Sequence, residues 1–237
     1  MTESGSIVIR AALIIPAFNE EEVIEQALDA IPSDLYSLII VADNGSTDRT
    51  AALARGRGAT VVSQLEKGYG AACLQAMGAL PASIEAVVFM QADNSEVASE
   101  AHSLLAPIAR GEADLVIGSR VLGNAEPGAL LPHQRLGNEL AIMLIRVFWG
   151  HRYTDLGPYR AISAAGLKAL GMTDRNYGWT VEMQVRALRH GLRVLEIPVT
   201  YKVRAAGENK VSGNLTTSIR AGAKIIWTIA RLLVSRS

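Results

Sequence analysis

Several short polar motifs in this 237-residue chain each follow an apolar run that is long enough for one buried strand. The run 86–90 ends in Gln91-Ala92-Asp93, and an earlier run ends in Asp43-Asn44-Gly45-Ser46. A carboxylate such as Asp93 can hold a divalent cation, and the cation can in turn hold a diphosphate. Taken alone, each motif is also ordinary turn chemistry, because Asp, Asn, Gly and Ser are common in turns.

The elements that would position these motifs alternate between strand and helix. Apolar runs predict strands over residues 7–15, 38–42, 60–63 and 86–90, with helical patterns between them. This alternation predicts an α/β fold, with a doubly wound, mostly parallel sheet and helices on both faces. Ligands of such sheets bind beyond the carboxyl ends of the strands, so we expect the motifs to meet at that edge.

The residue types at this edge suit a ligand that carries phosphate. Asp43 can accept hydrogen bonds from a base or a ribose, and Lys67 offers a cation. Gly45 and Gly68 allow a ligand to approach the backbone closely, because glycine has no Cβ. Asp93 offers the metal ligand, and the four features in this order are a stronger signal than any one alone.

The second half predicts helices over 102–109, 135–149, 164–170, 179–190 and 215–234, and strands over 115–118 and 194–202. The Gly- and Pro-rich segment 121–133 and the polar segment 204–213 follow strands near the predicted site. We expect both to be loops that close over a bound ligand. In the first half, Pro16 is expected to end the first strand and Asn19 to cap the next helix.

The composition excludes several functional classes. Lys+Arg and Asp+Glu number 23 each, so the formal charge is zero and no nucleic-acid partner is expected. The single cysteine, Cys73, cannot build a disulfide framework or a Cys/His zinc site, and a reducing compartment is expected. The first residues lack the features of a signal peptide, and no run of 18 apolar residues is present, so we expect a cytoplasmic protein.

The motifs resemble those of family-2 glycosyltransferases with the GT-A fold, especially the branch similar to dolichyl-phosphate mannosyltransferases. The similarity extends over about residues 7–213, in segments 14–21, 41–48, 67–72, 91–93, 118–120, 155–161, 177–183 and 204–212. It implies one glycosyltransferase domain over 1–237, with a donor half at about 7–120, an acceptor half at about 121–213 and a C-terminal amphipathic helix at 214–237. The donor would be a UDP- or GDP-sugar, and the acceptor either a polyprenyl phosphate or a soluble molecule.

The resemblance also implies roles for individual residues. The nucleotide sugar would be held by residues that follow the strands: Pro16, Ala17, Asn19, Glu20, Asp43, Gly45, Lys67, Gly68, Gln91, Ala92, Asp93 and Lys210. The family's Asp-x-Asp metal motif is Gln91-Ala92-Asp93 here, so a glutamine replaces its first aspartate. Because a neutral amide is a poor ligand for a hard cation, we expect Asp93 to hold Mg²⁺ or Mn²⁺ with the substrate phosphates, and with weakened metal affinity.

Catalytic roles follow from the same resemblance. The metal, together with Arg120 or Lys210, would stabilise the leaving diphosphate. Glu182 and Asp155 are the candidates for a general base, which a hydroxyl acceptor requires and a phosphate acceptor does not. The alternatives are that Glu182 is a solvated helix residue and Asp155 a turn residue. Arg160 would hold an acceptor phosphate or pair with a carboxylate.

The last predicted helix places Arg220, Lys224, Trp227 and Arg231 on one face. Basic residues around a tryptophan suit a peripheral position on the inner face of a membrane, whereas packing on the core or in a homodimer is the alternative. Two other functional classes stay open at this point. One is a nucleotide-sugar-binding protein with weak or no turnover. The other is a nucleotidyltransferase, although residues 16–19 lack the Gly-rich phosphate loop such enzymes need.

Overall fold

One seven-stranded sheet with the order β3-β2-β1-β4-β6-β5-β7 forms the centre of the fold. The structure is a computed structural model that describes residues 9–205 and 215–234. The strands are β1 (Ala11–Ala17), β2 (Leu38–Asp43), β3 (Thr60–Ser63), β4 (Ala86–Phe89), β5 (Leu115–Ala125), β6 (Arg160–Ser163) and β7 (Val194–Tyr201). Among the seven strands of the described ranges, only the pairings of β6 with β4 and β5 are antiparallel, which confirms the mostly parallel sheet.

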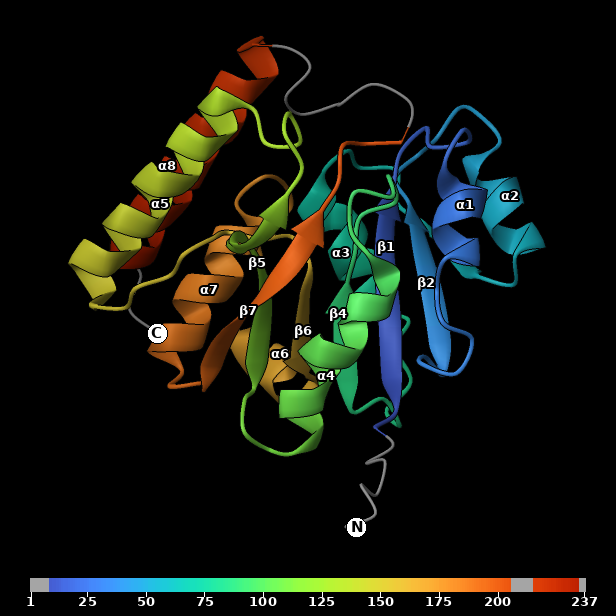
Figure 1. Cartoon of the computed structure of the whole chain (residues 1–237), viewed down its shortest axis with the longest axis horizontal. Helices are drawn as coiled ribbons and strands as arrows, with labels where there is room; N and C mark the ends of the chain where they lie inside the picture. Colours follow the sequence, from blue (N-terminus) through green and yellow to red (C-terminus); the bar gives the residue numbers. More distant parts are fainter. Residues whose placement is uncertain (1–8, 206–214, 235–237) are drawn as a thin grey trace.

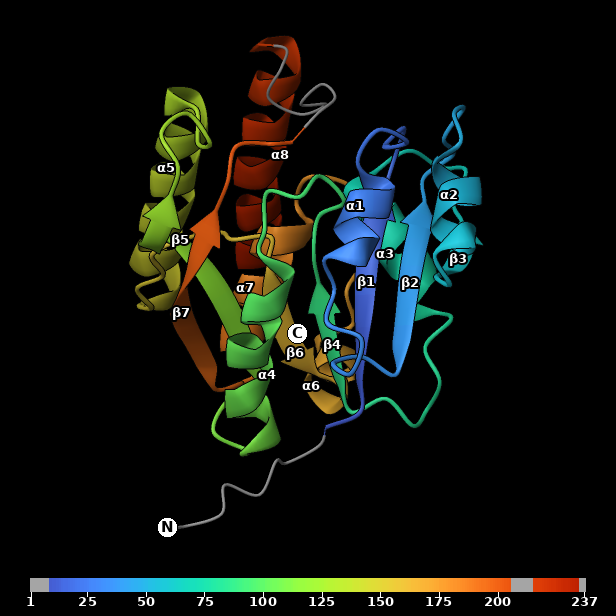
Figure 2. The same cartoon turned by 45° about the vertical axis from the view of Figure 1, so that its right-hand side comes forward.

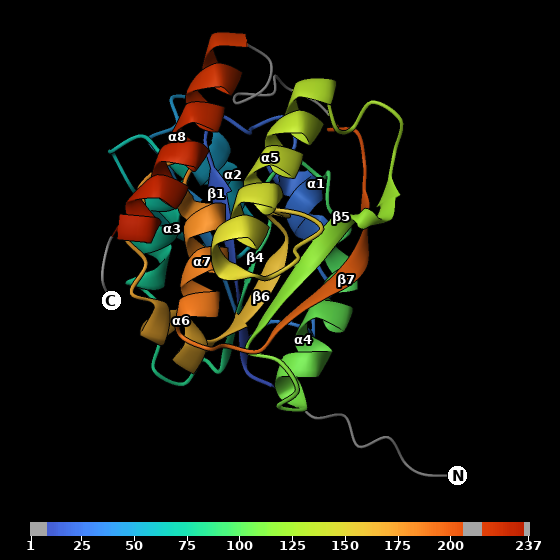
Figure 3. The ribbon, with the colours of Figure 1, turned by 90° about the vertical axis from the view of Figure 1, so that its left-hand side faces the viewer.

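Helices cover both faces of this sheet, as the sequence predicts. They are α1 (Ile24–Asp29), α2 (Thr50–Gly56), α3 (Tyr69–Met77), α4 (Ala101–Ala109), α5 (Pro132–Trp149), α6 (Ala164–Leu170), α7 (Trp179–Arg189) and α8 (Leu215–Val234), with a 3₁₀ turn η1 (Ala98–Glu100) before α4. Alternate strand residues face opposite sides, so Ile14 and Phe89 pack with α3 and α5–α8 while Leu13 and Val88 pack with α1, α2 and α4. Figures 2 and 3 show the two faces in turn.

The parallel strands end together at one edge of the sheet, the upper edge in Figure 1. Helices α5 and α8 lie side by side and extend past this edge (Figure 1). None of the helices in the described ranges is both long and apolar enough to cross a membrane.

The prediction that Pro16 ends the first strand is wrong. Pro16 lies within β1 and pairs with Ala42 of β2. The carbonyl of Ala17 accepts a hydrogen bond from the β2 side and that of Ile14 from the β4 side. Because successive residues of a strand point their backbone groups to opposite sides, the nitrogen of Pro16 faces the β4 side. It lies two residues beyond the last β1–β4 pair, Ile14 with Phe89. The missing N–H therefore removes no ladder hydrogen bond.

The predicted loop 121–133 is also wrong over most of its length. Residues 121–125 continue β5 along β7 after an irregularity in register between Ser119 and Asn124, and α5 begins at Pro132. Gly123 lies against the backbone of Val199, where a Cβ would overlap the chain, and this explains a glycine inside a strand. Most of the second predicted loop, including Lys210, lies outside the described residues.

Two further local predictions need correction. β6 was not predicted, although its four residues join β4 to β5 through antiparallel pairing. Asn19 does not cap a helix, because α1 begins at Ile24 and its cap position is Val23. Asn19 adopts a positive φ of 52° instead, and its side-chain oxygen accepts a hydrogen bond from the backbone of Thr47 at 2.8 Å.

Candidate functional site

A cavity of about 560 Å³ lies at the carboxyl edge of the sheet, and we call it the donor-side cavity. Its volume falls within the range typical of small-molecule sites. Among the predicted residues, those that line it are Pro16, Ala17, Glu20, Lys67, Gly68, Gln91, Ala92, Asp93 and Arg120. The rest of the lining received no site role from the sequence, although six of its residues lie in segments that resemble the family. It consists of Phe18, Asn44, Tyr69, Ala72, Gln134, Asn176, Tyr177, Tyr201 and Arg204.

Three predicted residues lie behind the cavity wall instead of in it. Asp43 is buried, and its carboxylate accepts a hydrogen bond from the backbone of Ser46 at 3.1 Å. Asn19 holds the same turn through Thr47. Gly45 has a φ of +72°, and a Cβ there would lie 3.2 Å from the Lys67 amine. These residues stabilise the turn after β2, and this turn lies behind the cavity wall.

Lys67 is a structural cation in this arrangement. Its amine donates to the carbonyls of Asn44 and Gly45 at 2.9 and 2.7 Å and lies 3.7 Å from the ring centre of Phe18. Asn44 connects the same two loops, because its side chain accepts from Gly68 and donates to two carbonyls of the 64–66 segment. The signal for Asn44 was present in the sequence, directly after Asp43.

Asp93 lies in the cavity wall at the end of β4. One of its oxygens accepts hydrogen bonds from the amide and hydroxyl of Ser95, at 3.0 and 2.5 Å. The other oxygen lies 3.4 Å from the guanidinium of Arg204, which also pairs with Glu20. Arg204 thus connects the chain at the ends of β1, β4 and β7. It lies in segment 204–212, one of those that resemble the glycosyltransferase family.

The donor set at Asp93 fits a hard divalent cation only in part. Asp93 offers one carboxylate, and the side chain of Gln91 accepts from the Ser95 hydroxyl at 3.3 Å. Across the described ranges, no group of three or more His, Cys, Asp or Glu side chains is arranged to hold a metal. Mg²⁺ needs only one or two carboxylates when substrate phosphates supply further oxygens, so Asp93 together with a diphosphate meets this minimum.

Glu96 is a buried carboxyl just behind this wall. One oxygen accepts from the backbone of Gln91 at 2.7 Å, whereas the other has no partner within the described part of the chain. Burial raises the pKa of Glu96 to about 8; the Gln91 hydrogen bond opposes the shift and the charge of Asp93 adds to it. Glu96 is therefore largely protonated at neutral pH.

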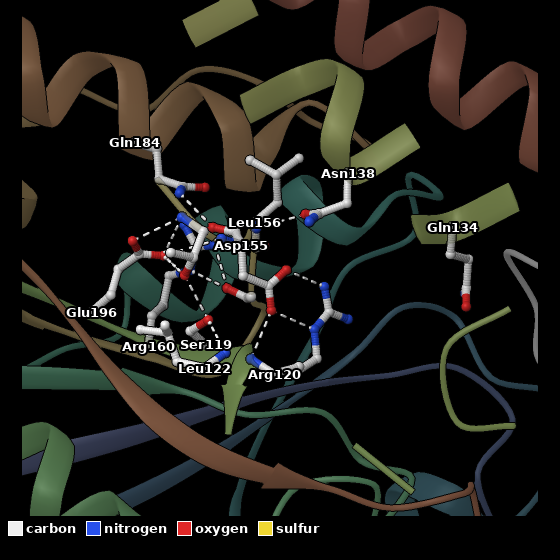
Figure 4. Close-up of polar contacts among 12 residues, drawn as sticks. Ser119, Arg120, Leu122, Gln134, Asn138, Asp155, Leu156, Arg160, Gln184 and Glu196 are labelled. Atoms are coloured by element: carbon white, nitrogen blue, oxygen red, sulfur yellow. Dashed lines mark hydrogen bonds and ion pairs between the residues drawn. The ribbon is translucent and has the colours of Figure 1, made fainter. Parts of the chain in front are cut away.

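A second cavity of about 310 Å³ adjoins the first, and the two share Arg120 and Gln134 in their linings. Asp155 lies in its wall with an almost fully buried side chain and grips Arg120 through both carboxylate oxygens, at 2.8 and 2.7 Å. Figure 4 shows this pair with Glu196, which accepts from the backbone of Asp155. Burial lowers the pKa of Arg120, but the hydrogen bonds and charge of Asp155 outweigh this and raise it.

Glu182 lines neither cavity and is completely buried. Its carboxylate accepts from the backbone amides of Thr173 and Asp174 and pairs with Arg186 and Arg231. It is thus not a solvated helix residue, and it presents no oxygen to either cavity. Asp155 is likewise more than a turn residue.

Arg160 fits neither of its predicted roles. It is fully buried in β6, and its guanidinium donates to the backbone carbonyls of Leu156, Gly157 and Thr180. Burial lowers the pKa of Arg160. Its guanidinium thus satisfies three buried or part-buried carbonyl groups of the protein interior.

Two cations of the predicted basic face of the last helix pack on the protein, which is the stated alternative to a membrane surface. Lys224 pairs with Asp174 at 3.0 Å, and Arg231 pairs with Glu182 at 3.2 Å. Both partner carboxylates are completely buried, so these two cations point into the protein. Trp227 lies between them and is about half exposed.

The sequence matches a known protein family and several known proteins. Residues 12–170 match the family model described as Glycosyl transferase family 2. An uncharacterized glycosyltransferase of Mycobacterium bovis is 38% identical over 213 residues, which cover 88% of this chain and 93% of that protein. The undecaprenyl-phosphate mannosyltransferase of Micrococcus luteus is 31% identical over 222 residues, which cover 87% and 89%.

A solved structure shows the same fold. Glucosyl-3-phosphoglycerate synthase from Mycobacterium tuberculosis, crystallised with Mn²⁺, UDP and glucosyl-3-phosphoglycerate, superposes with a TM-score of 0.77. The identity is 23%, and the match covers 97% of this chain and 81% of that chain. The predicted GT-A architecture is thereby confirmed.

Proposed function

Because this chain belongs to glycosyl transferase family 2, we propose that it moves a sugar from a UDP- or GDP-sugar in the donor-side cavity to a phosphate acceptor in the adjoining cavity. Membership of the family makes the chain a glycosyltransferase, as its motifs predict, and removes the need for the nucleotidyltransferase alternative. The observation that carries the proposal is the convergence of Glu20, Asp93 and Arg120 in one cavity at the carboxyl edge of the sheet.

The donor would lie with its nucleoside toward the β1 and β2 ends and its diphosphate toward Asp93. Gly68 lines this part of the cavity, and its missing side chain makes room for the carbonyl of Arg175 in the same wall. Asp93, with the diphosphate itself, would hold a Mg²⁺ or Mn²⁺ ion, whose charge stabilises the leaving nucleoside diphosphate. Arg120 lies at the junction of the two cavities and supplies a fixed positive charge to the same end.

The acceptor class follows from the state of the two predicted bases. Asp155 has both carboxylate oxygens bound to Arg120, and Glu182 is buried away from both cavities. Neither presents a free oxygen that would take a proton from a hydroxyl acceptor. A phosphate is already anionic and needs no base, so it fits this site better. We assign Asp155 the role of orienting Arg120.

A polyprenyl phosphate is the specific acceptor that we favour, and the mannosyltransferase relative supports it. Apolar residues on one side of α5 are exposed: Leu136, Leu140, Met143 and Val147. They recur at helical spacing on the helix that lines the second cavity, so a lipid chain leaving that cavity would meet them. Contact with a membrane surface would then be peripheral.

Calorimetry and product analysis test the proposal directly. Titration with UDP- and GDP-sugars, with and without Mn²⁺, should show binding for one nucleotide family. Transfer of a radiolabelled sugar should then occur to a polyprenyl phosphate in detergent and not to a neutral polyprenol. Binding of no nucleotide sugar would refute the donor assignment, whereas transfer only to a soluble acceptor would refute the lipid assignment.

Vesicle binding tests the peripheral contact separately. Sedimentation with phosphatidylglycerol vesicles should retain the wild type and release Leu136→Ser/Val147→Ser. Release of both proteins would contradict the membrane contact. Light scattering on the same samples would reveal a homodimer that covers α5 instead.

A further inference from the structure

We propose that Lys224 and Thr228 of α8 position the donor-side cavity from outside it, through the buried carboxylate of Asp174. The inference rests on the proposed function, since it takes the nucleotide sugar to be the ligand of that cavity. It concerns α8, and none of the side chains that the structure describes in this helix, from Arg220 onward, lines the cavity.

The segment 174–177 forms one wall of the donor-side cavity. Asn176 and Tyr177 line the cavity directly. The backbone of the same segment packs against the loop that carries Gly68, where the amide of Ala71 donates to the carbonyl of Arg175 at 2.8 Å. A Cβ on Gly68 or Gly70 would overlap the carbonyl oxygens of this segment. Any shift of the segment is therefore transmitted to both sides of the ligand space.

Asp174 fixes the shape of this segment. One of its carboxylate oxygens accepts from the backbone amides of Asn176 at 2.8 Å and Gly178 at 3.1 Å. Its own amide donates to Glu182 at 2.6 Å. The carboxylate thus holds the backbone turn of residues 174–178, which precedes the start of α7 at Trp179.

The other oxygen of Asp174 depends on α8. Lys224 lies 3.0 Å from it and the hydroxyl of Thr228 donates to it at 3.3 Å, while Arg231 lies 4.0 Å away. The side chain of Asp174 has no exposed surface, so solvent cannot replace these partners. A buried carboxylate that loses its cation must recruit another partner or take up a proton, and either change disturbs its bonds to the wall.

Removing the Lys224 charge should therefore weaken donor binding although Lys224 touches no donor. We expect Lys224→Met to raise the dissociation constant and the KM of the nucleotide sugar by about tenfold, within the roughly 5- to 150-fold typical of coupled sites. The KM of the acceptor should stay unchanged, because the second cavity receives no residue from 174–177. Thr228→Val should have a smaller effect in the same direction.

The matched control is Lys168→Met, the same substitution at an exposed position of α6. It should bind the nucleotide like the wild type. Lys224→Arg should restore most of the affinity, because it returns a cation to Asp174. Melting curves show whether each variant is folded. If Lys224→Met is unfolded, Thr228→Val and Lys224→Arg still test the proposal.

Trp227 supplies a signal that a purely structural role would not give. Its ring lies 4.3 Å from the Lys224 amine and 5.2 Å from the Arg231 guanidinium. Nucleotide binding should change the tryptophan fluorescence, and the change should be smaller in Trp227→Phe, which retains Trp179 beside the wall. Folded Lys224→Met and Thr228→Val proteins that bind the nucleotide like the wild type, or a signal that is undiminished in Trp227→Phe, would overturn the inference. A wild type that binds no nucleotide sugar would instead overturn the proposed function on which it rests.

Discussion

Arg120 and Asp155 form a two-pronged ion pair between the end of the regular part of β5 and the loop before β6, with side chains that are 14% and 1% exposed. The backbone amide of Arg120 donates to the same carboxylate at 2.9 Å. The carboxylate thus fixes both the main chain and the guanidinium of the residue at which the two cavities meet.

The first prediction concerns this pair. Asp155→Asn should lower kcat strongly while the KM of the donor changes little, because Arg120 loses its orientation and not its charge. Breaking a buried pair costs about 3–5 kcal/mol, so the melting temperature should fall as well. Steady-state kinetics and calorimetry measure the two effects. An Asp155→Asn enzyme with a normal kcat would show that Arg120 needs no orienting carboxylate.

The second prediction concerns the metal. Metal-borne charge is worth several kcal/mol, and each ~1.4 kcal/mol is tenfold in rate, so Asp93→Ala should reduce turnover by roughly a hundredfold or more. Gln91→Asp should lower the Mn²⁺ concentration needed for half-maximal activity, because it adds a second carboxylate. Metal titrations of the three enzymes measure both effects. An active Asp93→Ala enzyme would mean that Arg120 or Arg204 neutralises the diphosphate without a metal.

The third prediction concerns Asn44, which lines the donor-side cavity, and Asp43, which supports the same turn from behind. Asn44→Asp has nearly the same shape, but it cannot donate to the carbonyls of Gln64 and Glu66 and brings a negative charge toward them. Nucleotide affinity should fall by up to about thirtyfold, since two lost hydrogen bonds of about 1 kcal/mol each amount to about 2 kcal/mol. Asp43→Ala should also lose nucleotide binding while the protein stays folded. Unchanged titration curves for both variants would remove this loop from the donor site.

The fourth prediction concerns pH. The pKa of Glu96 is about 8 in the folded protein against an ordinary value of 4.5, so the folded state holds a proton that the unfolded state releases between these values. This group therefore makes stability fall as pH rises from about 4.5 to 8. Asp93, Arg120 and Arg160 are the charged neighbours of Glu96. In Glu96→Gln, the melting temperature should drop less between pH 5 and pH 8 than in the wild type. Parallel curves for the two proteins would contradict the buried, protonated state.

The local pattern of apolar and polar residues was sufficient to predict the strands of the parallel part of the sheet. The apolar runs before Asp43 and Asp93 end where the strands end, because the transition from apolar to polar residues coincides with the edge of the sheet. Most of the predicted donor residues consequently line one cavity. The pattern was insufficient for β6, because it begins with the charged residue Arg160 and shows no continuous apolar run, and because its partners lie in β4 and β5.

The unpredicted site features depend on distance along the chain. Arg204 contacts residues that are 111 and 184 positions away, and no local signal indicates such a pairing. Glu182 looks like a surface residue in sequence, because one of the two cations that pair with its buried carboxylate comes from another helix. Arg231, which supplies one of them, is 49 positions away.

The late position of β6 has a consequence for synthesis of the chain. Strand β4 is complete at residue 89, but the partner on its outer edge is not made until residue 163. In the interval, a nascent chain has β3, β2, β1 and β4 available with the apolar edge of Val87 and Val88 unpaired. Unpaired apolar edges associate with other chains, so fragments that stop before Arg160 should aggregate on the ribosome or after release. The insertion of four residues between two strands that were already made closes this edge of β4.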